Sequence, residues 1–140
     1  MFAAAGTAYV YRSYGIHWLL NVSVEPAGSG AAVLLRAAQV LTGEEVVRPR
    51  RPTARRDGDL LRGPAVLTAG LEVTGTDDDG RDLLVEGPRV WLASDGWRPA
   101  AAAVAAGPRV GISRAADVPW RFHLEGASSV SRYRRSPRAP

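Results

Sequence analysis

A chain of 140 residues, of which 46% are hydrophobic, is long enough to bury a packed core within one domain. It has no cysteine and only two histidines, which excludes a disulfide framework and leaves too few ligands for a thiolate or histidine metal site. All 18 basic residues are arginine, and the net charge is +4. This excess of guanidinium suits phosphate binding, although a biased genomic base composition also favours arginine over lysine.

Residues 1–15 contain neither a basic segment nor a long apolar one, so they do not resemble a signal peptide. No apolar run reaches the length of a membrane span. We therefore expect a protein of the cytoplasm, nucleoid-associated if bacterial, that is neither secreted nor held in a membrane.

Residues 8–24 are predicted to form two β-strands that meet at a tight turn over residues 13–15. Gly15 provides the positive φ that such a turn needs. Tyr14 stands beside this glycine, where a core residue is not normally found. Its ring either folds back over the hairpin, which is the common outcome, or projects as a wedge that enters a base stack.

The first of these strands has one aromatic face. Tyr9 and Tyr11 are two residues apart and therefore point the same way, whereas Val10 and Arg12 point the other way. The second strand is an apolar run that contains the polar Asn21.

Residues 25–30 are predicted to form a loop, and residues 31–37 a buried strand that closes with Arg36. A charged side chain at the end of an apolar run is expensive to desolvate alone. Arg36 is therefore expected either to pair with a carboxylate or to point into a polar cavity.

A block of arginines follows in residues 42–62. Pro49 and Pro52 would interrupt a long helix, so we expect a short helical turn from about Gly43 and then a loop. The block is either a solvated surface or a phosphate-contact surface on which Arg48 and Arg51 are candidate DNA-binding residues. Its arginines are Arg48, Arg50, Arg51, Arg55, Arg56 and Arg62.

The next segments predict short elements. Residues 62–73 suit an amphipathic helix packed on the sheet, and residues 74–82 an acidic, solvated turn whose spacing does not fit a calcium loop. Residues 85–92 are predicted to be a strand with Trp91 inward. Residues 99–106 are rich in alanine and specify no element.

Residues 107–112 and 119–124 are predicted to be further strands, and Gly111 within the first marks a place of close approach. Residues 131–140 are a basic, proline-containing tail that we expect to be frayed. The whole pattern predicts a mixed α/β (α+β) fold: a single domain around a curved antiparallel β-sheet, with a protruding β-hairpin and a few short helices.

Five stretches, in order and spacing, resemble the 3-methyladenine DNA glycosylase family of the alkyladenine, or methylpurine, type. They are GTAYVYRSYGIHWLLN at 6–21, AVLLRA at 32–37, GPAVL at 63–67, RVGI at 109–112 and PWRF at 119–122. No single stretch would suffice, but together they extend the resemblance from residue 1 to about residue 130. Residues 1–130 are thus the expected glycosylase-like domain, and 131–140 its tail.

The resemblance implies a monofunctional enzyme of base-excision repair that hydrolyses the N-glycosidic bond of alkylated or deaminated purines. Such an enzyme flips the damaged nucleotide out of double-stranded DNA, because the anomeric carbon cannot be reached inside the stack. It implies no metal and no other cofactor. We expect it to act as a monomer.

The resemblance also implies roles for residues of the hairpin. Tyr14 matches the residue that fills the gap left by the flipped nucleotide, and Tyr11 matches an aromatic ring stacked on the base. Asn21 matches a pocket residue that disfavours guanine by crowding its exocyclic amine. Ile16 and His17 match contacts in the minor groove beside the wedge.

Two further matches concern the attacking water. Arg36 and the backbone carbonyl of Val110 match groups that hold it, while a carboxylate deprotonates it as in inverting glycoside cleavage. The family's general-base glutamate precedes the Gly-Thr-x-Tyr-Val-Tyr element and is missing from this chain. Glu25, Glu44 and Glu45 are not at its position.

Two explanations of the missing acid remain open, a reading frame that starts too late and a truncated, inactive relative, and we favour the first. Two other functions also remain open. One is a non-catalytic module that binds damaged DNA with the same tyrosines and arginines. The other is a small arginine-rich domain that binds RNA or the ribosome.

Overall fold

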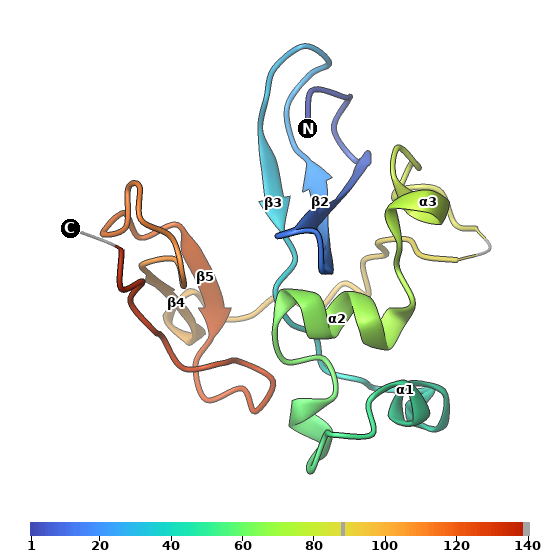
Figure 1. Ribbon diagram of the computed structural model, residues 1–140, viewed down its shortest axis with the longest axis vertical. Coiled ribbons are helices and arrows are strands. Elements are labelled where there is room, and N and C mark those ends of the chain that lie inside the picture. The colour runs from blue at the N-terminus through green and yellow to red at the C-terminus, as the bar shows by residue number, and fades with distance from the viewer. Residues whose placement is uncertain (88, 139–140) are drawn as a thin grey trace.

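The architecture comes from a computed structural model, which describes residues 1–87 and 89–138. Within these residues, five strands form a three-stranded antiparallel sheet of order β1-β2-β3 and a two-stranded antiparallel sheet of β4 and β5 (Figure 1). The strands are β1 (Ala8–Ser13), β2 (His17–Ser23), β3 (Ala32–Leu34), β4 (Val104–Gly107) and β5 (Arg121–Leu124). The helices are α1 (Glu44–Arg50), α2 (Pro64–Leu71) and α3 (Gly75–Asp78), with 3₁₀ turns at Asp57–Asp59 and Ala101–Ala103. The predicted α+β class is confirmed.

The predicted hairpin forms from β1 and β2, and its two faces have different surroundings. The register pairs Tyr9 with Asn21, and Tyr11 lies two residues from Tyr9, so these three side chains share one face. The opposite face packs into the main core. That core consists of Ala8, Val10, Leu20, Leu67, Val73 and Leu83.

Helix α2 covers the core face of the hairpin, which confirms the predicted packing of residues 62–73. Pro64 occupies the first turn of the helix, where a missing N–H needs no partner. Leu67 enters the main core, and the hydroxyl of Thr68 donates to the backbone carbonyl of Trp18 on β2 over 2.7 Å. The helix therefore fixes β2 of the hairpin both by burial and by a hydrogen bond.

The predicted helical turn from Gly43 also forms, as α1. Gly43 adopts φ 79° immediately before the helix, and the chain leaves the helix at Arg51. Val47 packs in a second, smaller core with Leu60 and Leu61. Figure 1 shows α2 between this helix and the three-stranded sheet.

The outer edge of β1 is covered by the segment that follows α3. The N–H of Ala8 donates to the carbonyl of Arg81 over 2.7 Å, and the N–H of Gly80 donates to the carbonyl of Ala8 over 3.0 Å. The next free donor, the N–H of Val10, binds the Asp79 carboxylate over 2.8 Å. The first half of this edge is thus not available for pairing with another strand.

Two predictions about strands need correction. The strand expected over residues 31–37 is only three residues long, and Val33 in it is 50% exposed because β3 is an outer strand. It ends at Leu34, two residues before Arg36. The strand predicted over residues 107–112 is wrong beyond Gly107, because Pro108 has no N–H to continue the ladder.

The strand predicted over residues 85–92 is also wrong. No strand is present in the part of this segment that the structure describes, which excludes Pro88, and Trp91 is 40% exposed instead of inward. The alanine-rich segment that specified no element contains a 3₁₀ turn and most of β4. The strand predicted over residues 119–124 is confirmed as β5.

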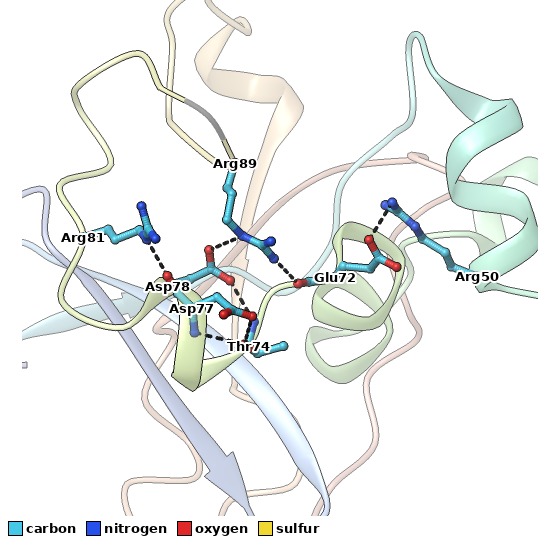
Figure 2. Close-up of polar contacts among 7 residues, drawn as sticks. All are labelled: Arg50, Glu72, Thr74, Asp77, Asp78, Arg81 and Arg89. Atoms are coloured by element: carbon cyan, nitrogen blue, oxygen red, sulfur yellow. Dashed lines mark hydrogen bonds and ion pairs between the residues drawn. The ribbon is translucent and has the colours of Figure 1, made fainter.

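The acidic segment 74–82 is not a simple solvated turn, because Asp78 on α3 is fully buried. Its carboxylate accepts bonds from the Thr74 N–H over 2.8 Å and from the Arg89 guanidinium over 3.0 Å (Figure 2). Arg89 also donates to the backbone carbonyl of Glu72 over 2.8 Å, and the Glu72 carboxylate pairs with Arg50 of α1 over 2.7 Å. The network therefore ties α1, the end of α2, α3 and the following loop together.

We expect Asp78→Asn to lower the free energy of unfolding by about 2 kcal/mol, because it weakens two hydrogen bonds to a buried charged acceptor. Urea denaturation followed by circular dichroism measures this change. Asp117→Asn is the matched control: this carboxylate pairs with Arg135, but its side chain is 77% exposed, so its loss should have little effect. Equal effects of the two substitutions would contradict the role given to Asp78.

Candidate active site

The tip of the hairpin is a strained and exposed turn. Tyr14 and Gly15 have φ of 51° and 70°, and the N–H of Ile16 donates to the carbonyl of Ser13 over 3.0 Å. Two successive positive φ values are typical of the hairpin turn whose twist matches the strands, but they are uncommon for a tyrosine. Tyr14 is 88% exposed, so its ring does not fold back over the hairpin.

A cavity of about 850 Å³ lies between the three-stranded sheet and the β4–β5 sheet. Four of the residues predicted for the site line it: Tyr11 on β1, Asn21 on β2, Arg36 after β3 and Val110 after β4. These residues are far apart in the sequence, and the fold brings them together. The volume is in the range of sites that enclose small organic ligands.

Tyr11 presents a supported ring at this cavity. Its ring stacks on that of Tyr9, with centroids 5.2 Å apart and planes 24° apart, as expected from their shared face. Burial and the neighbouring Tyr9 raise the pKa of the Tyr11 phenol, so it stays neutral at physiological pH. Asn21 is buried, and its amide nitrogen donates to the carbonyl of Tyr9 over 3.0 Å, which holds the amide in place.

Arg36 is half-buried in the wall of the cavity and forms no ion pair within the described residues. Of the two environments expected for it, pairing with a carboxylate is not found among the described residues, and Arg36 lines a cavity with both polar and apolar walls. Burial, and then the charge of Arg121, lower the pKa of the Arg36 guanidinium. Val110 lies beside Gly111, whose φ of 74° turns the chain at the same wall.

The remaining candidates lie elsewhere. Ile16 and His17 are exposed near the hairpin tip and line a smaller cavity of about 460 Å³ beside α2. Arg48 and Arg51 belong to α1 and to its C-terminal cap, and neither lines a cavity. Tyr14 stands clear of both cavities. Some candidates therefore line the larger cavity and others lie near the hairpin tip, while Arg48 and Arg51 belong to neither group.

Arg48 and Arg51 differ in their surroundings. The guanidinium of Arg48 binds the carboxylates of Glu44 and Asp57, both over 2.6 Å, and the hydrogen bond to Glu44 is the main cause of its raised pKa. Arg51 is half-buried, and its Nε is buried without a hydrogen-bond partner in the described structure. Arg48 therefore belongs to a solvated surface on which it pairs with carboxylates of the same chain, and not to a surface of unpaired arginines.

Sequence reasoning missed a group of cavity residues contributed by the C-terminal half of the chain. Arg109 stacks over the Trp120 ring with its guanidinium carbon 5.1 Å from the ring centroid. Arg121 on β5 is 8% exposed, and His123 on the same strand has a buried Nδ1 without a partner among the described residues. The family stretches RVGI and PWRF lie in this region of the sequence. However, no local sequence pattern indicated that these side chains line a cavity.

A cluster of metal ligands and a membrane-spanning helix are both absent from the part of the chain that the structure describes. No group of three or more histidine, aspartate or glutamate side chains could hold a metal ion there. No helix among the described residues has the length and apolar character needed to cross a bilayer.

Comparison with known proteins agrees with the resemblance seen in the five stretches. Residues 1–128 match the family model described as methylpurine-DNA glycosylase (MPG). A relative from Nocardia farcinica (strain IFM 10152) is 51% identical over 140 residues, which are 100% of this chain and 65% of the relative. A relative from Mycobacterium sp. (strain KMS) is 48% identical, and the match covers 100% of this chain and 66% of the relative. A relative from Rhodococcus jostii (strain RHA1) is 46% identical, and the match covers 99% of this chain and 60% of the relative.

All three relatives are named provisionally as 3-methyladenine DNA glycosylases, and this chain spans less than two thirds of the length of each. The family match covers nearly the whole chain, including the hairpin, both walls of the larger cavity and β5. The chain belongs to the methylpurine-DNA glycosylase family.

Proposed function

We propose that this protein acts in base-excision repair as a DNA glycosylase that flips alkylated or deaminated purines out of duplex DNA and hydrolyses their N-glycosidic bonds. One observation carries the proposal: Tyr11, Asn21, Arg36 and Val110 line a single cavity, while Tyr14 projects from the hairpin. The names of the relatives, 3-methyladenine DNA glycosylase, agree with a purine lesion as the substrate.

Tyr14 is proposed to enter the duplex through the minor groove and to fill the gap left by the flipped nucleotide. Its 88% exposure leaves the ring free to insert, and the short turn between two paired strands keeps the tip rigid. Unstacking a base step costs a few kcal/mol, so a wedge must be held firmly to be effective. The positive φ of Tyr14 is backbone strain of the kind that concentrates at functional sites.

The cavity is proposed to receive the damaged purine, with the ring of Tyr11 stacked on it. A neutral, electron-rich phenol attracts a positively charged alkylpurine more strongly than an undamaged base. Tyr9 supports the ring from behind at 5.2 Å. The amide of Asn21, held by its bond to Tyr9, would crowd the exocyclic amine that distinguishes guanine.

In the chemical step, water attacks the anomeric carbon, the bond from that carbon to the purine nitrogen breaks, and the base departs with the bonding electrons. Arg36 and the carbonyl of Val110 are proposed to hold the water. The described residues that line the cavity include no aspartate or glutamate to accept the proton from the water. This observation favours, as a second candidate function, a module that binds damaged DNA without cleaving it.

Base release separates these two functions. We expect the 140-residue chain to bind duplex DNA that contains hypoxanthine or ethenoadenine, but to release little base, because the described residues that line its cavity include no carboxylate to act as general base. A chimaera that adds the parts of the Nocardia farcinica relative lying outside the matched 65% should release the base. Chromatography of the free base measures its release by the chain and by the chimaera. A chimaera that binds the lesion and releases nothing would overturn the enzymatic proposal.

Tyr14→Ser tests the wedge. It should weaken the flipping of a 2-aminopurine reporter about tenfold, because an aromatic contact with a base contributes about 1–3 kcal/mol. Thermal stability should stay nearly the same, because the side chain is 88% exposed. The matched control is Tyr133→Ser in the tail, where the ring is 40% exposed and flipping should not change. A large loss of stability in Tyr14→Ser would indicate a structural tyrosine instead.

Tyr11→Leu tests the stacking platform. We expect the affinity for a duplex with one ethenoadenine to fall about tenfold, since the aromatic face is lost while an apolar side chain remains. Tyr11→Phe keeps the face and should bind as the wild type does. Fluorescence anisotropy measures both affinities. Equal losses in the two variants would mean that the hydroxyl, and not the ring face, makes the contact.

A further inference from the structure

The larger cavity has an unusual charge, which the proposed roles of its residues do not explain. Three guanidinium groups line it, those of Arg36, Arg109 and Arg121. They come from three separate segments: the chain just after β3, the turn after β4, and β5. No carboxylate is present among the described residues that line this cavity.

Arg109 is already engaged by the protein. Its Nη2 donates to the carbonyls of Arg114 and Ala115 over 3.3 and 3.4 Å, and its guanidinium stacks over Trp120. It therefore forms part of the wall, with its Nη2 and the face of its guanidinium engaged by protein groups.

Arg121 and Arg36 have few such contacts. Arg121 is only 8% exposed, yet the one hydrogen bond of its side chain in the described structure runs from Nη2 to the carbonyl of Ser131 over 2.6 Å. Arg36 makes no side-chain hydrogen bond or ion pair in that part of the chain. The two groups are close enough for the charge of Arg121 to lower the pKa of Arg36.

Two guanidinium groups that share a cavity without a counter-charge are unfavourable, because each loses hydration and each repels the other. Arginine does not relieve this by losing its proton at physiological pH. The remaining way to balance the charge is an anion from outside the chain. The planar fork of the guanidinium matches the oxygens of a phosphate, which it binds in bidentate fashion.

We propose that Arg36 and Arg121 together bind a phosphate oxyanion, and that this anion is the backbone phosphodiester next to the flipped nucleotide. The proposal rests on the proposed function, since it places the nucleotide in the same cavity. A volume of about 850 Å³ is larger than a purine base alone requires, which leaves room for the sugar and a phosphate. Arg121 is then a positioning residue that fixes the sugar relative to Arg36 and Val110.

The test is a double-mutant cycle between the protein and the DNA. Fluorescence anisotropy gives the affinity of the 140-residue chain for a duplex with one ethenoadenine, and for the same duplex with neutral methylphosphonates on either side of the lesion. The protein variants are wild type, Arg121→Gln, Arg121→Lys and the matched control Arg98→Gln. Arg98 is exposed and lines neither cavity, so its loss changes the net charge equally.

We expect the neutral linkages to weaken wild type and Arg98→Gln about tenfold or more, as for one charged hydrogen bond. They should weaken Arg121→Gln much less than wild type, because only the contact with Arg36 remains to be lost. Arg121→Lys keeps the charge and should remain sensitive to them. If Arg121→Gln does not fold, the response of wild type and Arg121→Lys still decides the question.

A wild-type chain that is insensitive to the neutral linkages would overturn the proposal. If inorganic phosphate then bound to wild type but not to Arg121→Gln, the site would belong to a free phosphate. If neither anion bound, the pair would serve a carboxylate of another polypeptide segment, which also overturns the proposal. The cycle is repeated on undamaged duplex. A chain that shows no preference for the lesion would contradict the proposed function, but its response to the neutral linkages would still report on the phosphate contact.

Discussion

The register of the β1–β2 hairpin is the constraint on which the site depends. Side chains alternate between the faces of a strand, so a slip of one residue would turn Tyr11 into the core and Val10 into the cavity. Several contacts fix the register: the tight turn at Tyr14 and Gly15, the hydrogen bond from Thr68 to the β2 backbone, and the pairing of the segment after α3 with β1. The aromatic face of the cavity is thus set by interactions at the tip, at the outer edge and on the opposite face of the hairpin.

Arginines serve two different purposes in this protein, and their partners distinguish them. Six of them pair with carboxylates in the described structure, and Arg89 does so with the fully buried Asp78 of α3. These six are Arg48, Arg50, Arg56, Arg62, Arg89 and Arg135. The cavity arginines, by contrast, have no carboxylate among the described residues that line their cavity. The high arginine content is therefore not by itself a sign of DNA binding, but an arginine left without an acid is informative.

Elements that depend on local chemistry could be predicted from the sequence. A glycine beside the turn marked the hairpin, and Gly43 and Gly-Pro at residues 63–64 marked the starts of α1 and α2. Predictions failed where distant contacts decide the structure. Residues 85–92 have the apolar composition of a strand, yet Arg89 in this segment binds the distant Asp78. The alanines of β4 carry no pattern of polarity, so the strand is evident only from its pairing with β5.

The candidate site was predictable in the same uneven way. Periodicity placed Tyr9 and Tyr11 on one face, whereas the positions of Asn21, Arg36 and Val110 in the site came from the family resemblance. Arg121 was not found, because an arginine in a short strand usually points to solvent and nothing local shows that this one is buried. Only the packing of the β4–β5 sheet next to β3 reveals that it shares a cavity with Arg36.

The charge of the cavity also bears on how a cationic lesion could be accepted. Two like charges about 10 Å apart at an effective dielectric constant of about 20 repel by roughly 1–2 kcal/mol. An alkylated purine carrying a positive charge would meet this repulsion from each unpaired guanidinium, and the ring of Tyr11 offsets only part of it. A phosphodiester that enters with its nucleotide carries one negative charge, which offsets the repulsion from one of the two guanidinium groups. The cavity therefore accepts a cationic base more readily when it enters attached to its backbone than it would accept a free cationic base.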